Sequence, residues 1–277
     1  MISFPGGRME RKLIAGKFGT DKNQVYLDNY ERLFSGIRNE RITLLELGIF
    51  RGESLLLWEN YFSHGTIVGV DIHTSGVADK SPRIFEFAGY QQDTDFLDTV
   101  ARETAPEGFD IIIDDASHIG DISKITFWHL FENHLKPGGI YVIEDWRTGY
   151  WERWIDGVRY KKAKESAMIR PFLHGVADSC LNFTKSTCKG GRIKKTILSC
   201  LGKVKKITYK KRFPSHDFGM VGFIKELVDE LGIDMITSPE RGSTVPQQQP
   251  RFKRMEIGPG QVFIIKSGDS ELSGMIR

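Results

Sequence analysis

Residues 42–54 read ITLLELGIFRGES, and this stretch decides the fold. The apolar run at 42–49 has the length of a buried strand, and the polar and apolar residues that follow it through Trp58 predict a helix. Gly48 and Gly52 fall in the turn between them, where a backbone without a Cβ atom lets a ligand approach closely. Open α/β sheets bind ligands at this carboxyl end of their strands. We therefore expect a strand and a helix joined by a ligand-binding turn.

The same alternation continues toward the C-terminus. Apolar runs predict further strands at 66–72, 84–89, 109–115 and 139–145. Apolar residues at helical spacing predict helices at 94–104, 121–135 and 218–232, and a β-hairpin is expected at 252–267. Strands that are apolar on both faces and alternate with helices indicate the α/β class. The expected architecture is a doubly wound, mostly parallel seven-stranded sheet with a C-terminal antiparallel hairpin.

The composition is that of an ordinary globular protein. The chain has 277 residues, of which 40% are hydrophobic and 27% charged. No long uncharged apolar run predicts a transmembrane helix, and the first thirty residues show no secretory signal. The three cysteines are odd in number and lack CxxC spacing, which favours reduced thiols and a cytoplasmic location and suggests no zinc site.

The chain is expected to form a single domain over 1–277. Its parts are an N-terminal cap (1–38), a cofactor-binding core (39–145), an insertion or lid (146–216), and a C-terminal helix and hairpin that complete the sheet (217–277).

One basic segment carries most of the positive charge. Residues 185–212 contain 11 Lys and Arg and no acid, whereas the rest of the chain has 28 basic and 36 acidic side chains. The segment could be a solvated face, part of the lid, a subunit contact in a homo-oligomer, or a weak membrane-surface contact. A non-catalytic adaptor that holds nucleic acid through this segment is a less favoured alternative, and no nucleic-acid partner is expected.

Polar residues at the predicted strand ends suit an adenosyl cofactor. Asp71 closes the second strand, where a carboxylate can accept both ribose hydroxyls, and the third strand is followed by residues able to meet an adenine amino group, Gln91, Gln92 and Asp93. The turn after the first strand has the spacing E-x-G-x-x-x-G, with Ser54 close behind, rather than the G-x-G-x-x-G of dehydrogenases. The expected cofactor-binding set is completed by Glu46, Gly48, Gly52 and Asp114.

Acidic residues and a histidine follow the fourth and fifth strands. Asp115 and His118 lie three residues apart, and Glu144 and Asp145 end the neighbouring strand. Carboxylates that converge at one edge repel one another unless a cation lies among them, and oxygen ligands favour Mg²⁺. A helix cap or a salt-bridge cluster is the structural alternative.

The pattern resembles that of class I S-adenosylmethionine-dependent methyltransferases, and more narrowly the metal-dependent sugar O-methyltransferases of macrolide biosynthesis. The matching stretches are Gly19–Lys22 with Tyr26 and Tyr30, then 44–62, 69–72, 111–119, 138–146 and 149–151. The resemblance implies an enzyme that uses S-adenosylmethionine and Mg²⁺, with Asp115, Glu144 and Asp145 as metal ligands and His118 as the general base. It implies a sugar or vicinal diol of a secondary metabolite or glycan as acceptor. A catechol-like or small phenolic acceptor is the alternative.

Aromatic and histidine residues outside this set carry weaker expectations. Trp146, Tyr150 and Trp151 are candidates for stacking on the acceptor, with packing in a lid or an oligomer contact as the alternative. His129 and His134 belong to the predicted helix 121–135 and are expected to face solvent.

Overall fold

The computed structural model describes residues 13–77, 81–162 and 216–268, together with 176, 179–180, 182–184, 195–201 and 203. Most of the basic segment 185–212 therefore lies outside the described residues, and its expected roles stay predictions. No helix in the described part of the chain combines the length and the apolar character needed to cross a bilayer.

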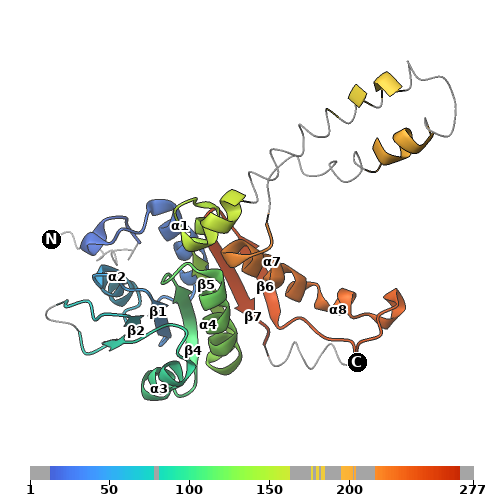
Figure 1. The fold of residues 1–277 in the computed structure, drawn as a ribbon. Helices are drawn as coiled ribbons and strands as arrows, with labels where there is room; N and C mark the ends of the chain where they lie inside the picture. Colours follow the sequence, from blue (N-terminus) through green and yellow to red (C-terminus); the bar gives the residue numbers. More distant parts are fainter. Residues whose placement is uncertain are drawn as a thin grey trace, which may run out of the picture.

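One seven-stranded sheet forms the centre of the protein, in the order β3-β2-β1-β4-β5-β7-β6 (Figure 1). Its strands are β1 (Thr43–Leu47), β2 (Thr66–Asp71), β3 (Ile84–Ala88), β4 (Phe109–Asp114), β5 (Leu135–Glu144), β6 (Phe252–Ile257) and β7 (Gln261–Lys266). The first five pair in parallel, whereas β7 runs antiparallel to both β5 and β6. The expected sheet and its C-terminal hairpin are confirmed.

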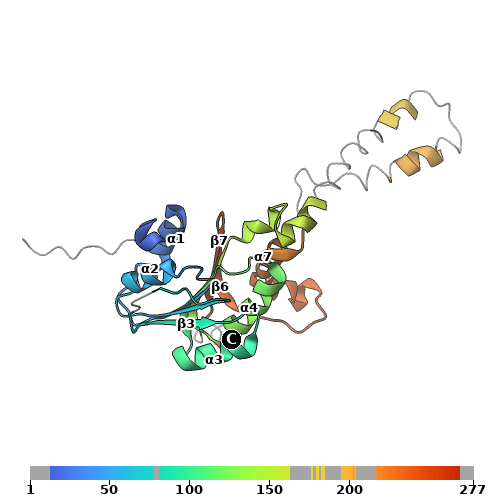
Figure 2. The same ribbon diagram turned by 60° about the vertical axis from the view of Figure 1, so that its left-hand side comes forward.

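Helices cover both faces of the sheet (Figures 1 and 2). They are α1 (Gln24–Phe34), α2 (Glu53–Tyr61), α3 (Thr94–Thr104), α4 (Gly120–Asn133) and α7 (Gly219–Leu231). The short α8 (Ile233–Ile236) follows α7 and has no buried residue. Single turns of 3₁₀ helix occur at Lys17–Gly19, Trp146–Tyr150 and Pro239–Arg241.

Alternation along the strands divides the core into two layers. On β4, Ile112 packs with the side chains of α3, α4 and α7, whereas Ile111 and Ile113 pack with those of α1 and α2. Successive side chains of a strand point to opposite faces, so a strand buried on both faces must be apolar throughout. This is why the continuous apolar runs of the sequence mark the parallel strands.

The end of α4, the start of β5 and the presence of α1 differ from the sequence-based expectation. Helix α4 ends at Asn133, and β5 already begins at Leu135, which pairs with Phe109 before the register shifts. Pro137 and the glycines after it thus lie within the irregular start of the strand rather than in the turn that ends the helix. Helix α1 was not expected within the N-terminal cap.

Candidate active site

A cavity of about 880 Å³ opens at the carboxyl ends of the parallel strands. It lies where the sheet order places the loops after β1, β2, β4 and β5 side by side. The cavity wall includes nine of the residues expected from the sequence: Gly48, Ser54, Asp71, Gln91, Gln92, Asp115, His118, Glu144 and Asp145.

The loop after β1 comes very close to the loop after β4. Gly48 has φ +83°, and a Cβ atom there would lie 2.2 Å from the carbonyl oxygen of Asp115. Oδ2 of Asp71 accepts hydrogen bonds from the backbone N–H groups of Ile49 and Phe50, at 2.9 and 3.0 Å. The carboxylate at the end of β2 therefore fixes the glycine-rich turn. A carboxylate has about four lone-pair sites, so Asp71 keeps capacity for a ligand.

Four expected cofactor residues lie outside the cavity wall: Glu46, Gly52, Asp93 and Asp114. Asp93 caps α3 by accepting from the N–H of Phe96, and Glu46 is fully buried, with its Oε2 accepting from Ser54 Oγ at 2.6 Å. Asp114 accepts from Gln91 Nε2 at 3.1 Å. These residues shape the loops behind the wall, and their direct contact with a cofactor stays a prediction.

Gln91 is held by protein partners at both ends of its amide. Its Nε2 donates to Asp114 and Thr126, and its Oε1 accepts from the N–H of Ser117 at 2.9 Å. This buried side chain links the loop after β3 to the loop after β4, so it positions the segment that leads to His118.

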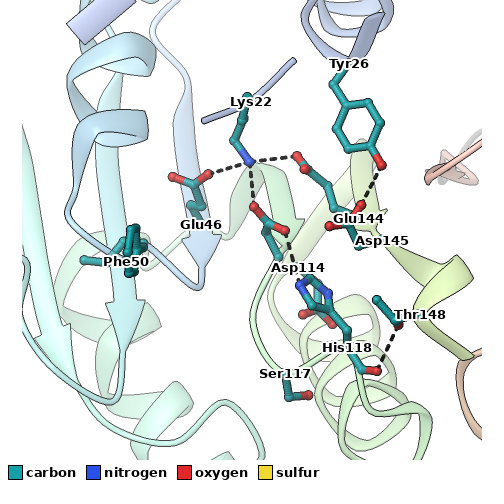
Figure 3. A network of polar contacts seen from close by, with 12 residues as sticks. Lys22, Tyr26, Glu46, Phe50, Asp114, Ser117, His118, Glu144, Asp145 and Thr148 are labelled. Carbon is teal, nitrogen blue, oxygen red and sulfur yellow. Dashed lines mark hydrogen bonds and ion pairs between the residues drawn. The ribbon is translucent and has the colours of Figure 1, made fainter. Parts of the chain in front are cut away.

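A buried lysine is the centre of the acidic cluster (Figure 3). The Lys22 side chain is only 3% exposed, and its Nζ lies 2.8 Å from Asp115 Oδ2, 2.9 Å from Glu144 Oε1 and 3.3 Å from Glu46 Oε1. The cap thus reaches over the ends of β1, β4 and β5 and brings one positive charge among the carboxylates. The expectation of a cation among these acids is met in part by this ammonium group.

Two tyrosines of α1 reinforce the cluster. Tyr26 donates its O–H to Asp145 Oδ1 at 2.6 Å, and Tyr30 donates to Glu144 Oε1. Burial, followed by hydrogen bonding and charge repulsion from the acids, raises the pKa of the Tyr26 hydroxyl, so it remains a donor. Helix α1 therefore holds both carboxylates at the end of β5.

Burial and the charges of neighbouring groups shift the pKa values of the cluster. Burial alone lowers the pKa of the Lys22 ammonium, but the nearby acids outweigh it and raise the pKa well above its usual value. Burial raises the pKa of Asp115 to about 6 despite the lysine, and burial with repulsion from Asp115 raises the pKa of Glu144 to about 7. The single Lys22 ammonium group contacts three carboxylates, those of Glu46, Asp115 and Glu144, and the charge of Asp145 acts on Asp115 as well.

These residues fit a divalent cation. One ligand atom each from Asp115, His118 and Asp145 lie within 4.8 Å of one another. Glu144 lines the same cavity, although its Oε1 already accepts from Lys22 and Tyr30. Carboxylate oxygens beside a cavity with room for water suit the hard ion Mg²⁺, whose +2 charge would offset the surplus of negative charge.

His118 is held in an unusual backbone conformation next to these acids. Its φ is +51°, and its carbonyl oxygen accepts from Trp154 Nε1 at 3.0 Å and from Thr148 Oγ1 at 3.4 Å. Its Nε2 lies 3.7 Å from Asp115 Oδ1. Two donors from the segment after β5 thus fix the strained backbone and hold the imidazole at the cavity wall.

The three aromatic residues expected to bind the acceptor lie outside the main cavity. Trp146 donates from Nε1 to the carbonyl of Gly258 in the β6–β7 turn, at 3.0 Å. Trp146 and Tyr150 line a second, shallow pocket of about 360 Å³, whereas the side chain of Trp151 is exposed. Their contact with an acceptor stays a prediction.

Sequence reasoning did not predict the contacts that four residues make at the site: Lys22, Tyr26, Phe50 and Trp154. Phe50 is 70% exposed, lines the cavity and has φ +46°. An exposed aromatic side chain on strained backbone gains nothing from burial, which suggests that the ring serves a ligand. The sequence pattern alone contains no signal for these side-chain contacts, although the resemblance already drew attention to the segment that carries Lys22 and Tyr26.

Comparison with known proteins identifies relatives of this chain. No family model matches the sequence. The chain is 41% identical over 133 residues to mycinamicin VI 2''-O-methyltransferase of Micromonospora griseorubida, a match that covers 46% of this chain and 32% of that protein. It is 40% identical over 133 residues to demethylmacrocin O-methyltransferase of Streptomyces fradiae, covering 46% and 33%. The chain therefore spans about a third of the length of these curated relatives.

Solved structures show the same fold. Two crystal forms of the MycE methyltransferase from the mycinamycin biosynthetic pathway, each in complex with Mg and SAH, match this chain. The first has a TM-score of 0.60 at 24% identity and covers 95% of this chain and 55% of that chain. The second has a TM-score of 0.55 at 26% identity and covers 87% and 48%. This chain thus has the class I methyltransferase fold and is a homologue of macrolide sugar O-methyltransferases over about half of its length.

Proposed function

We propose that this chain transfers a methyl group from S-adenosylmethionine to a hydroxyl oxygen of a sugar, in a reaction assisted by Mg²⁺. One observation carries the proposal: three carboxylates and one imidazole line the same cavity as the Gly48 turn. They belong to Asp115, Glu144, Asp145 and His118. Two further relatives, 38% and 37% identical to this chain, are named as O-methyltransferases of L-olivosyl-oleandolide and of a rhamnosyl tetracenomycin C, which supports the sugar acceptor over a phenolic one.

The loops after β1 and β2 are suited to hold the nucleoside. Asp71 has a carboxylate beside the turn, and Gly48 lets the turn pack directly against the loop after β4. Phe50 offers an exposed ring from the same turn. The methyl donor would then lie between this turn and the acidic cluster.

The acidic cluster would hold the metal and the acceptor oxygen. When bound, Mg²⁺ supplies positive charge that lowers the pKa of a coordinated hydroxyl and fixes its position. Asp115, Glu144 and Asp145 would supply oxygen ligands, and Lys22 offsets part of their charge in the absence and presence of the ion.

His118 would accept the proton. The acceptor O–H bond breaks as its proton passes to an imidazole nitrogen, and the oxygen forms a bond to the methyl carbon. The bond between that carbon and sulfur breaks, and S-adenosylhomocysteine leaves as a neutral thioether. Correct orientation in line with the sulfur supplies much of the rate, and a general base typically contributes about 10²–10⁴-fold.

The test is methyl transfer from labelled S-adenosylmethionine to a panel of glycosylated macrolides, free deoxysugars and catechols. We expect transfer to a sugar hydroxyl that stops in EDTA and returns with Mg²⁺. Asp115→Asn should abolish transfer while thermal unfolding shows a folded chain. Full turnover in EDTA would refute the metal role, and transfer to catechols alone would refute the sugar acceptor.

A further inference from the structure

A second group of potential metal ligands lies between α3 and the end of α4. His129 Nε2 is 2.7 Å and His134 Nε2 is 2.6 Å from the same atom, Asp98 Oδ1. Both histidines were expected to face solvent. That expectation is wrong, because their side chains are only 17% and 19% exposed.

This group is separate from the proposed active site. The carbonyl of His134 accepts from the N–H of Phe109, the first residue of β4. The active-site residue Asp115 follows the other end of β4. At about 3.3 Å per residue, the two ends of that stretch are about 20 Å apart. The histidines therefore lie near the amino ends of the parallel strands, and the cavity lies at the carboxyl ends.

The placement of the two imidazole rings matches shared metal coordination. Two rings bound through nitrogen to one tetrahedral zinc ion at about 2.0–2.1 Å have centres about 5 Å apart. The rings of His129 and His134 have centres 5.4 Å apart. The ligand atoms of a tetrahedral zinc site are about 3.3 Å apart. Asp98 Oδ1 now lies 2.7 and 2.6 Å from the two Nε2 atoms, so it would have to move away from them by about 0.6 Å when an ion binds. Its side chain is 45% exposed, which leaves room for this movement.

We infer that Asp98, His129 and His134 bind a divalent transition-metal ion of the zinc type, with water completing the coordination. Imidazole nitrogens favour such an ion over Mg²⁺, which prefers oxygen ligands. The ion would tie the middle of α3 to the junction between α4 and β5.

The test uses the full chain, freed of metal with EDTA, dialysed, and kept in excess Mg²⁺ so that the acidic cluster is occupied. Zn²⁺ is titrated by calorimetry, and Co²⁺ is added to a second sample for its visible spectrum. The double variant His129→Gln/His134→Gln and the single variant Asp98→Asn test the ligands. His64→Gln is the matched control, because His64 is exposed and belongs to neither cluster.

We expect one zinc ion per wild-type chain, a rise in Tm of roughly 5 °C at saturating zinc, and a Co²⁺ spectrum without a thiolate band. The double variant should bind Zn²⁺ at least tenfold more weakly and lose the rise in Tm, whereas His64→Gln should keep both. Binding of S-adenosylhomocysteine reports that the variants are folded. Equal zinc binding by the double variant would overturn the inference and assign the ion elsewhere, for example to the exposed thiols of Cys180 and Cys200. Absence of zinc binding by the wild type would overturn it as well.

Discussion

Replacement of Lys22 by methionine tests the electrostatic balance of the acidic cluster. Methionine keeps much of the aliphatic stem and removes the charge, which leaves Glu46, Asp115 and Glu144 without the ammonium group that lies 2.8–3.3 Å from them. Removal of one partner of a buried ion pair costs about 3–5 kcal/mol. One kcal/mol shifts the Tm of a domain of this size by about 2–4 °C, so Tm should fall by roughly 10 °C in EDTA.

The loss of stability should depend on pH and on Mg²⁺. Without the lysine, the pKa values of Asp115 and Glu144 rise further, and protonation below about pH 6 limits the cost of burying them. The difference in Tm between Lys22→Met and the wild type should therefore be largest at pH 8 and small at pH 5. Mg²⁺ no longer competes with an ammonium group for Asp115 and Glu144, so it should stabilise the variant more than the wild type.

Thermal unfolding followed by circular dichroism, with and without Mg²⁺ at several pH values, measures these effects. Lys124→Met is the control, because Lys124 makes an ion pair with Glu226 in which both side chains are about half exposed. Exposed pairs contribute about 0–1 kcal/mol, so the control should shift Tm by no more than a few degrees. A Lys22→Met chain with wild-type Tm in EDTA at pH 8 would refute the view that Lys22 neutralises the cluster.

Three further outcomes are expected from the same site. Trp154→Phe removes the indole donor to the carbonyl of His118, so it should displace the His118 imidazole and lower kcat about tenfold, with little change in the KM for S-adenosylmethionine. An unchanged kcat would contradict this role of Trp154. Phe50→Ala keeps the strained backbone but removes the ring, so calorimetry should show about tenfold weaker binding of S-adenosylhomocysteine, with the ligand-free Tm unchanged. In EDTA, the free energy of unfolding should fall as the pH rises from about 4 to 7, because the raised pKa values of Asp115 and Glu144 make the folded chain bind more protons than the unfolded chain in this range. The affinity for Mg²⁺, measured by calorimetry, should rise over the same pH range.

The sequence predicts the sheet well because each buried parallel strand requires a continuous apolar run. A short run of this kind that is bounded by turn residues, as at Phe109–Asp114, favours a buried strand over a helix. Helix α1 was missed although a signal was present: Leu27, Tyr30 and Phe34 are buried at helical spacing, and Asn23 caps the helix. The start of β5 was placed too late because Pro137 is a strong turn signal, and only the pairing of Leu135 with β4 overrides it.

The site is predictable from the sequence only where residues lie at strand ends. Asp115 follows β4 and Glu144 is the last residue of β5, so the pairing of β4 with β5 brings them together. Lys22 is 93 and 122 residues away from these two partners, and no local pattern specifies such contacts. The same holds for Asp98 and His129, whose pairing depends on how α3 packs against α4.

Backbone strain is concentrated at the ends of the strands that form the cavity. Among the described residues, four other than glycine have positive φ, and three of them follow β1, β4 and β5: Phe50, His118 and Asp145. Such conformations cost about 1–3 kcal/mol each and persist only where surrounding contacts hold them. Those contacts are visible here, since Asp71 binds the N–H of Phe50, Trp154 binds the carbonyl of His118, and Tyr26 binds the carboxylate of Asp145. The strained positions direct an aromatic ring, an imidazole and a carboxylate from three separate loops toward one cavity. Packing alone does not require this arrangement, whereas the proposed methyl transfer, which depends on the orientation of its reactants, would require it.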